Sequence, residues 1–292
     1  MKNECHIKSL FEDFKKEIQK KENKNLIPTG IQPIDNIISG FELGDLVTIA
    51  GNACSGRTIF IMSLIRQMTI RNLTPTGIFC MDWKKHDFMN FLLSNVGSVS
   101  YSELKRNDCD IEGKEWFNKA EKEIGEAPLY LGGFGAMSIS SIEKNIRDLV
   151  LKHNLKVVII TGFQSVGFEM NYNDFRYGYT RNAQILKNLA RELNIAIVLT
   201  SRLNWDIEKY MLSEKSIPTL MDIRDIGDLD DLSDVVIGLY REGHFLENPN
   251  KLSNVVSLYF LKSKNGITHQ HIDMLINHLT LSFTRELENE YF

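Results

Sequence analysis

The chain has 292 residues, of which 43% are apolar and 25% are charged. This composition is typical of globular proteins and excludes disorder over most of the chain. The formal net charge of -4 excludes a polycation, so any contact with nucleic acid must come from local basic loops.

The cysteines, the N-terminus and the apolar runs indicate the compartment. Cys5, Cys54, Cys80 and Cys109 include no CxxC pair, and the first residues lack the apolar core of a signal peptide. The apolar runs are strand-sized, far below the about 18 residues that a membrane-spanning helix needs. His269, His271 and Asp273 would share one face of a predicted strand, but no further ligand with suitable spacing joins them, so they are expected to be ordinary strand residues. We therefore expect a protein of the reducing cytoplasm with no protein-ligated metal and no membrane contact.

Residues 1–24 predict an amphipathic linker helix. Its apolar side chains recur at helical spacing on a segment rich in Lys and Glu: Ile7, Leu10, Phe11, Phe14 and Ile18. The polar run KKENKN follows, and we place the domain boundary near Lys24. The apolar stripe packs either on the helix's own domain or on a neighbouring subunit, and the sequence leaves both open.

From residue 25 onward, short β-branched runs alternate with longer helical patterns. Strands are predicted at residues 46–50, 76–82, 128–133, 156–161 and 196–201. Helices are predicted at residues 56–72, 86–99, 138–154 and 181–194, with Ser138 as an N-cap. This alternation favours an α/β fold with a mostly parallel sheet that is covered by helices on both faces.

The C-terminal part changes character. Residues 234–242, 254–266, 269–277 and 279–286 are strand-like and are joined by short turns. The sheet is therefore expected to continue with antiparallel strands, within one domain at residues 25–292. The segment at residues 106–116 has mixed charge and predicts a solvated connection.

A glycine-rich turn between the first predicted strand and helix has the pattern of a phosphate-binding loop. Residues 51–58 read GNACSGRT and fit GxxxxGK[ST] at every position but the lysine. A curled backbone would turn its amides toward a phosphate at Gly51, Ser55 and Gly56. Thr58 would offer its hydroxyl to Mg²⁺, but Arg57 replaces a compact ammonium with a wide, planar guanidinium. We therefore expect a phosphate-loop fold in which catalysis is weakened.

Further motifs occur in a fixed order along the chain: IPTGIQPIDNIISGFELGD, LNIAIVLTSRLN, DIRDIGDLDDLSDVVIGLYRE and KSKNG. With the loop, they resemble the C-terminal, RecA-like motor domain of DnaB-type replicative DNA helicases, from about Lys15 to the C-terminus. The resemblance implies a RecA-like P-loop NTPase fold, ATP and Mg²⁺ as cofactors, and work in DNA replication or mobile-element maintenance. It also implies that the linker helix packs on an adjacent motor domain, so the expected partner is a second copy or an active helicase.

The resemblance assigns roles to individual positions. The catalytic glutamate that orients the attacking water falls on Asp82, and the Mg²⁺-linked aspartate falls on Thr161. The glutamine that senses the γ-phosphate falls on Arg202. The two basic residues that reach into a neighbour's site fall on Lys262 and Lys264.

Together with Arg57, these departures affect four parts of the site on which phosphoryl transfer relies. They are the cation that holds the phosphates, the Mg²⁺ site, the group that positions the water and the sensor of the γ-phosphate. We therefore expect a degraded ATP site with weak or no ATPase activity. Two alternatives stay open. Either Arg57 or Arg202 compensates for a weakly held Mg²⁺ and the chain is an active helicase motor, or the chain is a purely non-catalytic partner that assembles with or regulates an active helicase.

Two segments are candidates for contact with single-stranded DNA. The family's channel-loop motif falls on residues 224–227, where Arg224 and the amide of Gly227 could meet a phosphate, although the surrounding residues are acidic. In residues 169–181, Arg176 and Arg181 interleave with aromatic side chains: Tyr172, Phe175, Tyr177 and Tyr179. Such a mixture can stack bases and hold phosphates, but it is also typical of a subunit contact or a partly buried loop.

Overall fold

The computed structural model describes residues 7, 11, 12, 15, 25–106, 114–169, 174–203, 217–224, 226–241, 254–266, 268 and 270–286. Most of the predicted linker helix, the boundary at Lys24 and Tyr172 lie outside these residues. Ile7 and Phe11, two members of the predicted apolar stripe, are described and have exposed side chains.

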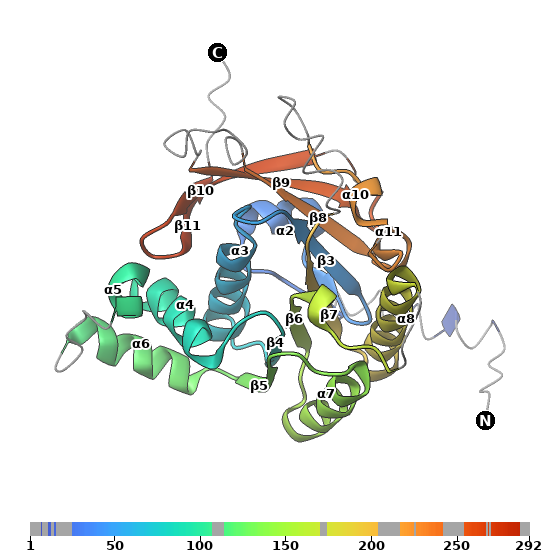
Figure 1. The fold of residues 1–292 in the computed structure, drawn as a ribbon, viewed down its shortest axis with the longest axis horizontal. Helices are drawn as coiled ribbons and strands as arrows, with labels where there is room; N and C mark the ends of the chain where they lie inside the picture. The colour runs from blue at the N-terminus through green and yellow to red at the C-terminus, as the bar shows by residue number, and fades with distance from the viewer. Residues whose placement is uncertain are drawn as a thin grey trace, which may run out of the picture.

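In the described part of the chain, a nine-stranded sheet forms the centre of the molecule (Figure 1). Its strands are β3 (Leu46–Gly51), β4 (Thr76–Cys80), β5 (Leu129–Phe134), β6 (Val157–Thr161), β7 (Ala196–Ser201), β8 (Val235–Tyr240), β9 (Val255–Lys262), β10 (Gln270–Asn277) and β11 (Ser282–Glu286). Their spatial order is β11-β10-β9-β8-β3-β7-β6-β4-β5. The strands from β8 to β5 in this order are parallel, and β9, β10 and β11 are antiparallel to their neighbours. The predicted parallel body and antiparallel C-terminal end are both confirmed.

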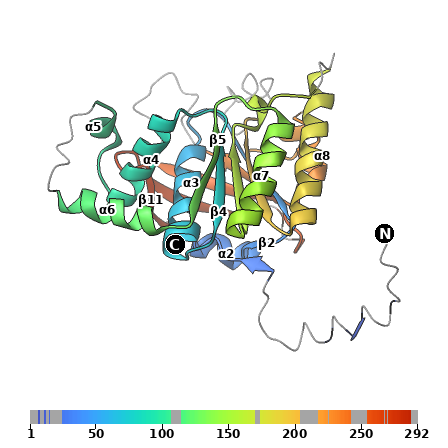
Figure 2. The same ribbon diagram turned by 90° about the horizontal axis from the view of Figure 1, so that it is seen from below.

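Helices cover both faces of this sheet (Figures 1 and 2). One face carries α2 (Gln32–Ile38), α3 (Arg57–Leu64), α4 (Lys85–Gly97) and α6 (Glu115–Glu126). The other carries α7 (Ile139–His153), α8 (Phe175–Leu193), α10 (Met221–Arg224) and α11 (Leu229–Leu232). Successive strand residues point to opposite faces, so Val47 and Ile49 enter the first core and Leu46 and Ala50 the second. Burial on both faces explains why these strands are continuous apolar runs.

The described structure also contains several short elements. β1 (Leu26–Ile27) and β2 (Phe41–Glu42) pair with each other outside the main sheet, and α5 (Tyr101–Arg106) follows α4. A short 3-10 helix, η2 (Phe163–Ser165), follows β6. None of the described helices has the length and apolar content of a membrane span.

The helix predicted at residues 56–72 is not α-helical throughout. After α3, the chain continues as a π-helix, η1 (Ile65–Arg71), and the amide of Asn72 donates to the carbonyl of Gln67, five residues back, at 3.0 Å. Spacing by 3.6 residues does not distinguish the two helix types over so short a segment. The sequence therefore predicted the helix but not its winding.

One helix starts earlier than predicted, and another was not predicted. α8 begins at Phe175 instead of Arg181, because the Asp174 side chain caps it by accepting a hydrogen bond from the amide of Arg176 at 2.8 Å. α6 begins at Glu115, so the predicted solvated connection is wrong at its C-terminal end, while residues 107–113 lie outside the described chain. The apolar spacing of Trp116, Ala120 and Ile124 is the signal for α6 that the sequence analysis missed.

Candidate functional site

The phosphate loop leaves the sheet at the carboxyl end of β3, where β3 lies between β7 and β8. α3 begins directly after Gly56, so the predicted strand, loop and helix follow one another as expected. The loop borders a cavity of about 300 Å³. Its lining includes Arg57 and Thr58 on the loop side, and Asp82, Arg241 and His278 from other segments.

The loop itself has the features of a phosphate site. Ser55 is 4% exposed, and within the described part of the chain its hydroxyl has no hydrogen-bond partner. A buried hydroxyl without a partner lowers the stability of the fold by about 1–3 kcal/mol. A ligand with oxygen acceptors would remove this cost by accepting a hydrogen bond from it. The N-terminal amides of α3 start at the same place and favour an anion. These residues therefore fit a phosphate group.

Arg57 brings a positive charge to the cavity. Its side chain is half-buried, and no hydrogen bond to another described residue holds its guanidinium. Burial lowers the pKa of Arg57 to about 10, helped by the charge of Arg202 and opposed by that of Asp82. The group is therefore charged at neutral pH and free to pair with an anion.

Asp82 and Thr161, to which the resemblance assigns the places of the catalytic glutamate and the Mg²⁺-linked aspartate, are in direct contact. Thr161 is fully buried at the end of β6, and its hydroxyl donates to Oδ1 of Asp82 at 2.6 Å. Asp82 provides the only carboxylate among the described residues that line the cavity. A divalent ion prefers several anionic oxygens, so one carboxylate already engaged by a hydroxyl is a poor site for Mg²⁺.

A glutamine that sequence analysis did not identify fixes the next part of the site. The amide nitrogen of Gln164, on η2, donates to Ser201 Oγ at 3.0 Å and to the carbonyl of Arg202 at 3.1 Å. The amide of Arg202 donates back to Gln164 Oε1 at 3.3 Å. The backbone of the predicted sensor Arg202 is thus held in place while its side chain is exposed.

An aromatic wall also borders the cavity and was not predicted as part of the site. Trp83 packs edge-on against Phe91, with ring centroids 5.3 Å apart, and Phe91 stacks on Tyr101 at 5.1 Å. Arg241 and His278 were missed as well. Arg241 follows β8 at the same edge of the sheet as the loop, so its place after a predicted strand could have identified it as a site residue. The position of His278 depends on the hairpin from β10 to β11.

The predicted basic residues that would reach a neighbour lie far from the loop of their own chain. Lys262 pairs with Val236 at the start of β8, and its Nζ donates to the carbonyls of Asp230 and Asp231 at 2.8 and 3.0 Å. Lys264 bonds to Glu42 at 3.0 Å and to Asp45, at the start of β3.

These ion pairs also alter how tightly Lys264 holds its proton. Burial works to lower the pKa of Lys264, but the hydrogen bonds to Asp45 and Glu42, with the charges of Asp45 and Asp234, raise it above its usual value. Lys264 is therefore a firmly protonated cation. Both lysines lie at the opposite end of the strands from the phosphate loop.

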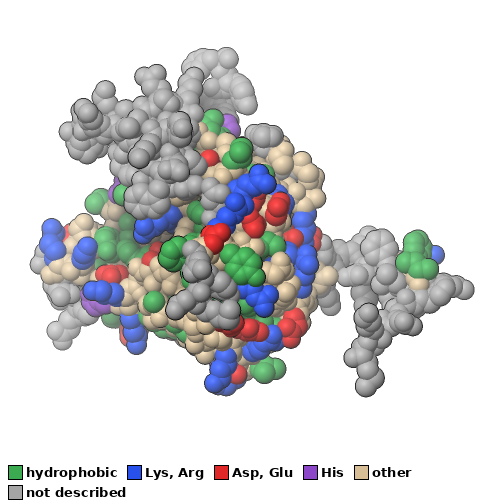
Figure 3. Space-filling model, turned by 45° about the vertical axis from the view of Figure 1, so that its right-hand side comes forward, with side chains coloured by type: hydrophobic (Ala, Val, Ile, Leu, Met, Phe, Trp, Pro, Cys, Tyr) green, Lys and Arg blue, Asp and Glu red, His purple; other side chains and the backbone are tan. Residues whose placement is uncertain are grey.

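The two candidate DNA segments lie side by side. Arg176 on α8 forms an ion pair with Asp228 at 2.9 Å, and a Cβ on the buried Gly227 would lie 2.6 Å from the backbone carbon of Tyr179. Arg181 and Arg224 are exposed. Tyr172 and Asp225 lie outside the described residues. On the side of the molecule that carries α8, basic and acidic side chains are intermingled (Figure 3).

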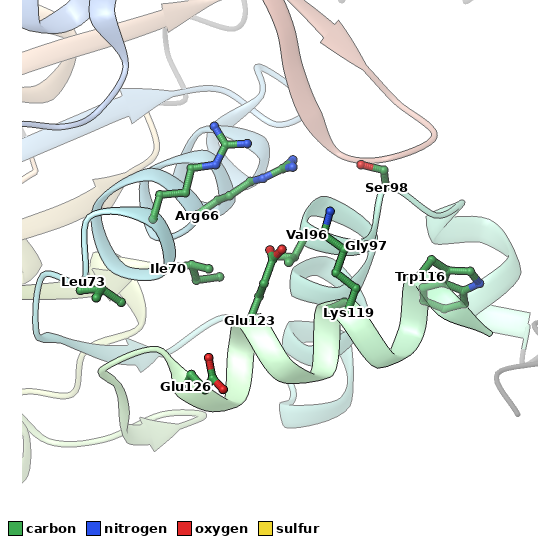
Figure 4. A pocket seen from close by; sticks show the side chains of 12 residues that line it. Arg66, Ile70, Leu73, Val96, Gly97, Ser98, Trp116, Lys119, Glu123 and Glu126 are labelled. Atoms are coloured by element: carbon green, nitrogen blue, oxygen red, sulfur yellow. The ribbon is translucent and has the colours of Figure 1, made fainter. Parts of the chain in front are cut away.

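A larger cavity of about 500 Å³ lies between η1, α4 and α6 (Figure 4). Arg66 of η1 lines it and donates from Nη1 to the carbonyl of Asn95 at 2.7 Å, which ties η1 to α4. Lys119 and Glu123 project from α6 on the other side. This cavity contains none of the site residues predicted from the sequence. No cluster of three metal-ligating side chains occurs among the described residues.

Comparison with known proteins places these features in a family. The chain matches the model described as DnaB-like helicase C terminal domain over residues 27–285. It is similar to the replicative DNA helicase DnaB of Rickettsia conorii, at 27% identity over 269 residues that cover 82% of this chain and 53% of that protein. It is also similar to a probable replicative DNA helicase of Trieres chinensis, at 24% identity, covering 88% of this chain and 57% of that protein. The chain thus spans about half the length of these relatives.

Solved structures agree on the fold. The ATPase domain of G40P superposes with a TM-score of 0.84 and 20% identity, covering 96% of this chain and 99% of that one. A structure of a DnaB-like replicative helicase and its interactions with primase gives a TM-score of 0.81 at 20% identity, covering 97% of this chain and 67% of that one. The predicted RecA-like architecture is confirmed. Because the family model matches most of its length, the chain belongs to the DnaB-like helicase C-terminal domain family.

Proposed function

We propose that the chain serves DNA replication or mobile-element maintenance as a phosphate-loop domain that binds a nucleoside triphosphate and hydrolyses it slowly at most. The observation that carries this proposal is the hydrogen bond between Thr161 and Asp82, because it joins the two positions that should hold Mg²⁺ and orient water. Ser55, the loop amides and Arg57 would hold the phosphates. When bound, ATP would supply the phosphoryl group for transfer to water. Among the described residues that line the cavity, only Asp82 has a carboxylate that could orient that water.

The test is ATP binding by calorimetry, with and without Mg²⁺. The natural chain is compared with a variant carrying Arg57→Lys and Thr161→Asp together, after both are shown to be folded by thermal unfolding. We expect the natural chain to bind ATP with little effect of Mg²⁺, and the variant to gain a Mg²⁺-dependent increase in affinity. Hydrolysis is measured on the same samples.

Two results would replace this proposal with an alternative. If the natural chain hydrolyses ATP with Mg²⁺ and single-stranded DNA stimulates this hydrolysis, the chain is an active helicase motor. Binding by the variant alone would make the natural chain a purely non-catalytic partner of an active helicase.

We also propose that the chain binds single-stranded DNA along the start of α8 and the adjacent Arg224. The exposed Phe175 and Tyr177 offer ring faces for stacking, and Arg181 and Arg224 offer charge for phosphates. The acidic neighbours oppose this binding, so we expect a weak affinity that falls with salt. An affinity for an oligonucleotide that does not change with salt would exclude this role.

Self-association through the N-terminal stripe is the third part of the proposal. Ile7 is 68% exposed and Phe11 is 56% exposed, so these two side chains are available to a neighbour, either a second copy or an active helicase. Phe11→Asp should reduce the oligomer fraction in analytical ultracentrifugation. Leu151→Asp, at an even more exposed apolar position on α7, is the matched control and should leave it unchanged.

A further inference from the structure

Two basic side chains meet at the phosphate-loop cavity. Arg241, directly after β8, is 7% exposed and donates from Nη2 to Nε2 of His278 at 2.6 Å. Its Nη1 donates to the carbonyl of Cys54 in the phosphate loop at 3.4 Å. His278 lies in the turn between β10 and β11, which is held to α5 by a hydrogen bond from the amide of Tyr101 to the carbonyl of Leu279 at 2.7 Å. Arg241 therefore links the loop to this turn.

The contact determines the protonation state of His278. A guanidinium can only donate hydrogen bonds, so Nε2 of His278 must accept, and the neutral ring carries its proton on Nδ1. Partial burial, together with the charge of Arg241, lowers the pKa of His278 below its usual value. The imidazole is therefore neutral at pH 7 while the cavity contains no anion.

The other groups around the cavity favour an anion. The described titratable or charged side chains that face the same space as His278 and Arg241 are Arg57, Cys54, Asp82 and Tyr101. Asp82 is the only carboxylate among them, and it shares the cavity with the two guanidinium groups of Arg57 and Arg241. An anion that enters the cavity would also favour the imidazolium form of His278, because opposite charges stabilise one another at short range.

We propose that Arg241 and His278 are binding residues for the anionic part of a nucleotide at the phosphate loop, and that His278 takes up one proton as the ligand enters. This inference rests on the proposed function, since it requires a nucleotide at the loop. On binding, the Arg241–His278 hydrogen bond breaks, and Nε2 receives a proton from the solvent. Both side chains then donate to the ligand. Their positive charge replaces that of a metal ion, which the Thr161–Asp82 pair is poorly suited to bind.

The test measures proton uptake with ATP as the probe. ATP is titrated by calorimetry into the natural chain and into His278→Gln, with a chelator present, in buffers that differ in their enthalpy of ionisation. Because Gln keeps an acceptor for Arg241 and His278 is exposed on a turn, we expect this variant to fold. The natural chain should take up as much as one more proton per ATP than the variant. Its affinity relative to the variant should rise by up to about tenfold per pH unit as the pH falls through the window between the two pKa values of His278.

The control is His271→Gln. His271 is also exposed, stacks on Tyr259 at 5.0 Å and does not line the cavity, so this variant should behave as the natural chain does. Equal proton uptake by the natural chain and His278→Gln overturns the inference and leaves the proposed nucleotide binding intact. If the natural chain binds no ATP at any pH, the proposed function and the inference both fail.

Discussion

Thr161 donates its hydroxyl to the Asp82 carboxylate at 2.6 Å, from a fully buried position at the end of β6. Thr161→Asp would place a second carboxylate at this point. Two carboxylates in contact cannot both ionise without cost, so we expect the free energy of unfolding to fall by about 3 kcal/mol without a metal ion. Mg²⁺ should then raise the unfolding temperature of this variant and not that of the natural chain.

The control for this prediction is Thr161→Asn, which has nearly the same shape as the aspartate but no charge. Its unfolding temperature should not respond to Mg²⁺. An equal response of the natural chain to Mg²⁺ would show that Asp82 and its surroundings already bind the ion.

Gly162 adopts a left-handed conformation with φ of 66°, and a Cβ there would lie 2.7 Å from Cγ of Asp82. We expect Gly162→Ala to cost about 2 kcal/mol in the free energy of unfolding, because backbone strain and a clash with Asp82 add up. Gly135→Ala, at φ of 75° with nothing within 4 Å of the new Cβ, should cost only about 1 kcal/mol. Denaturant titration measures both.

A double-mutant cycle isolates the clash. The background must be Asp82→Gly, because alanine would keep the Cβ that lies 2.8 Å from the new methyl group. In this background, Gly162→Ala should cost no more than Gly135→Ala does. If its cost stays the same, the strain lies in the backbone alone and Asp82 is not packed on Gly162.

Asp228 neutralises Arg176 in the candidate DNA surface, and the hydrogen bond from Arg176 lowers the pKa of Asp228. We expect Asp228→Asn to remove the negative charge paired with Arg176 and to increase the affinity for an oligonucleotide at low salt about threefold. The slope of log K against log salt should become more negative by about 0.7, as for one added phosphate contact on a single strand. Fluorescence anisotropy measures both quantities.

Glu192→Gln is the matched control, since it also removes one negative charge from an ion pair with an arginine, here Arg147 at 2.7 Å. It should leave the affinity and the salt slope nearly unchanged. An equal gain from both variants would assign the effect to net charge instead of to Arg176.

Lys187 is buried and forms an ion pair with the largely buried Asp234 near the start of β3, and the Asp234 carboxylate also accepts from the amide of Leu46 at 2.8 Å. Removing one partner leaves an uncompensated buried charge, so Lys187→Met should lower the free energy of unfolding by about 3 kcal/mol. Adding Asp234→Asn should restore part of this loss, because the amide oxygen still accepts from Leu46 and no charge remains. A double variant less stable than the single one would contradict this account.

The sequence predicted the parts of the fold that arise from local patterns. The runs at Leu46–Gly51 and Val157–Thr161 are β-branched and apolar because both faces of each strand are covered, and the loop pattern identified the turn that follows the first of them. The contact of Thr161 with Asp82 could not be predicted, since it depends on the pairing of β4 with β6 in space. His278 carries no local signal, because only the docking of its turn on α5 brings it to the cavity.

The phosphate loop lies at one end of the sheet strands, and Lys262 and Lys264, at and just after the end of β9, lie at the other, so two copies can associate head to tail. If Lys262 and Lys264 serve a neighbour's loop, Lys264 must first leave Glu42 and Asp45, and each head-to-tail contact completes one site. An open row of copies then always has one loop without lysines and one lysine pair without a loop. The number of complete sites would equal the number of chains only when the row closes into a ring. The activity per chain would therefore show whether the ring has closed.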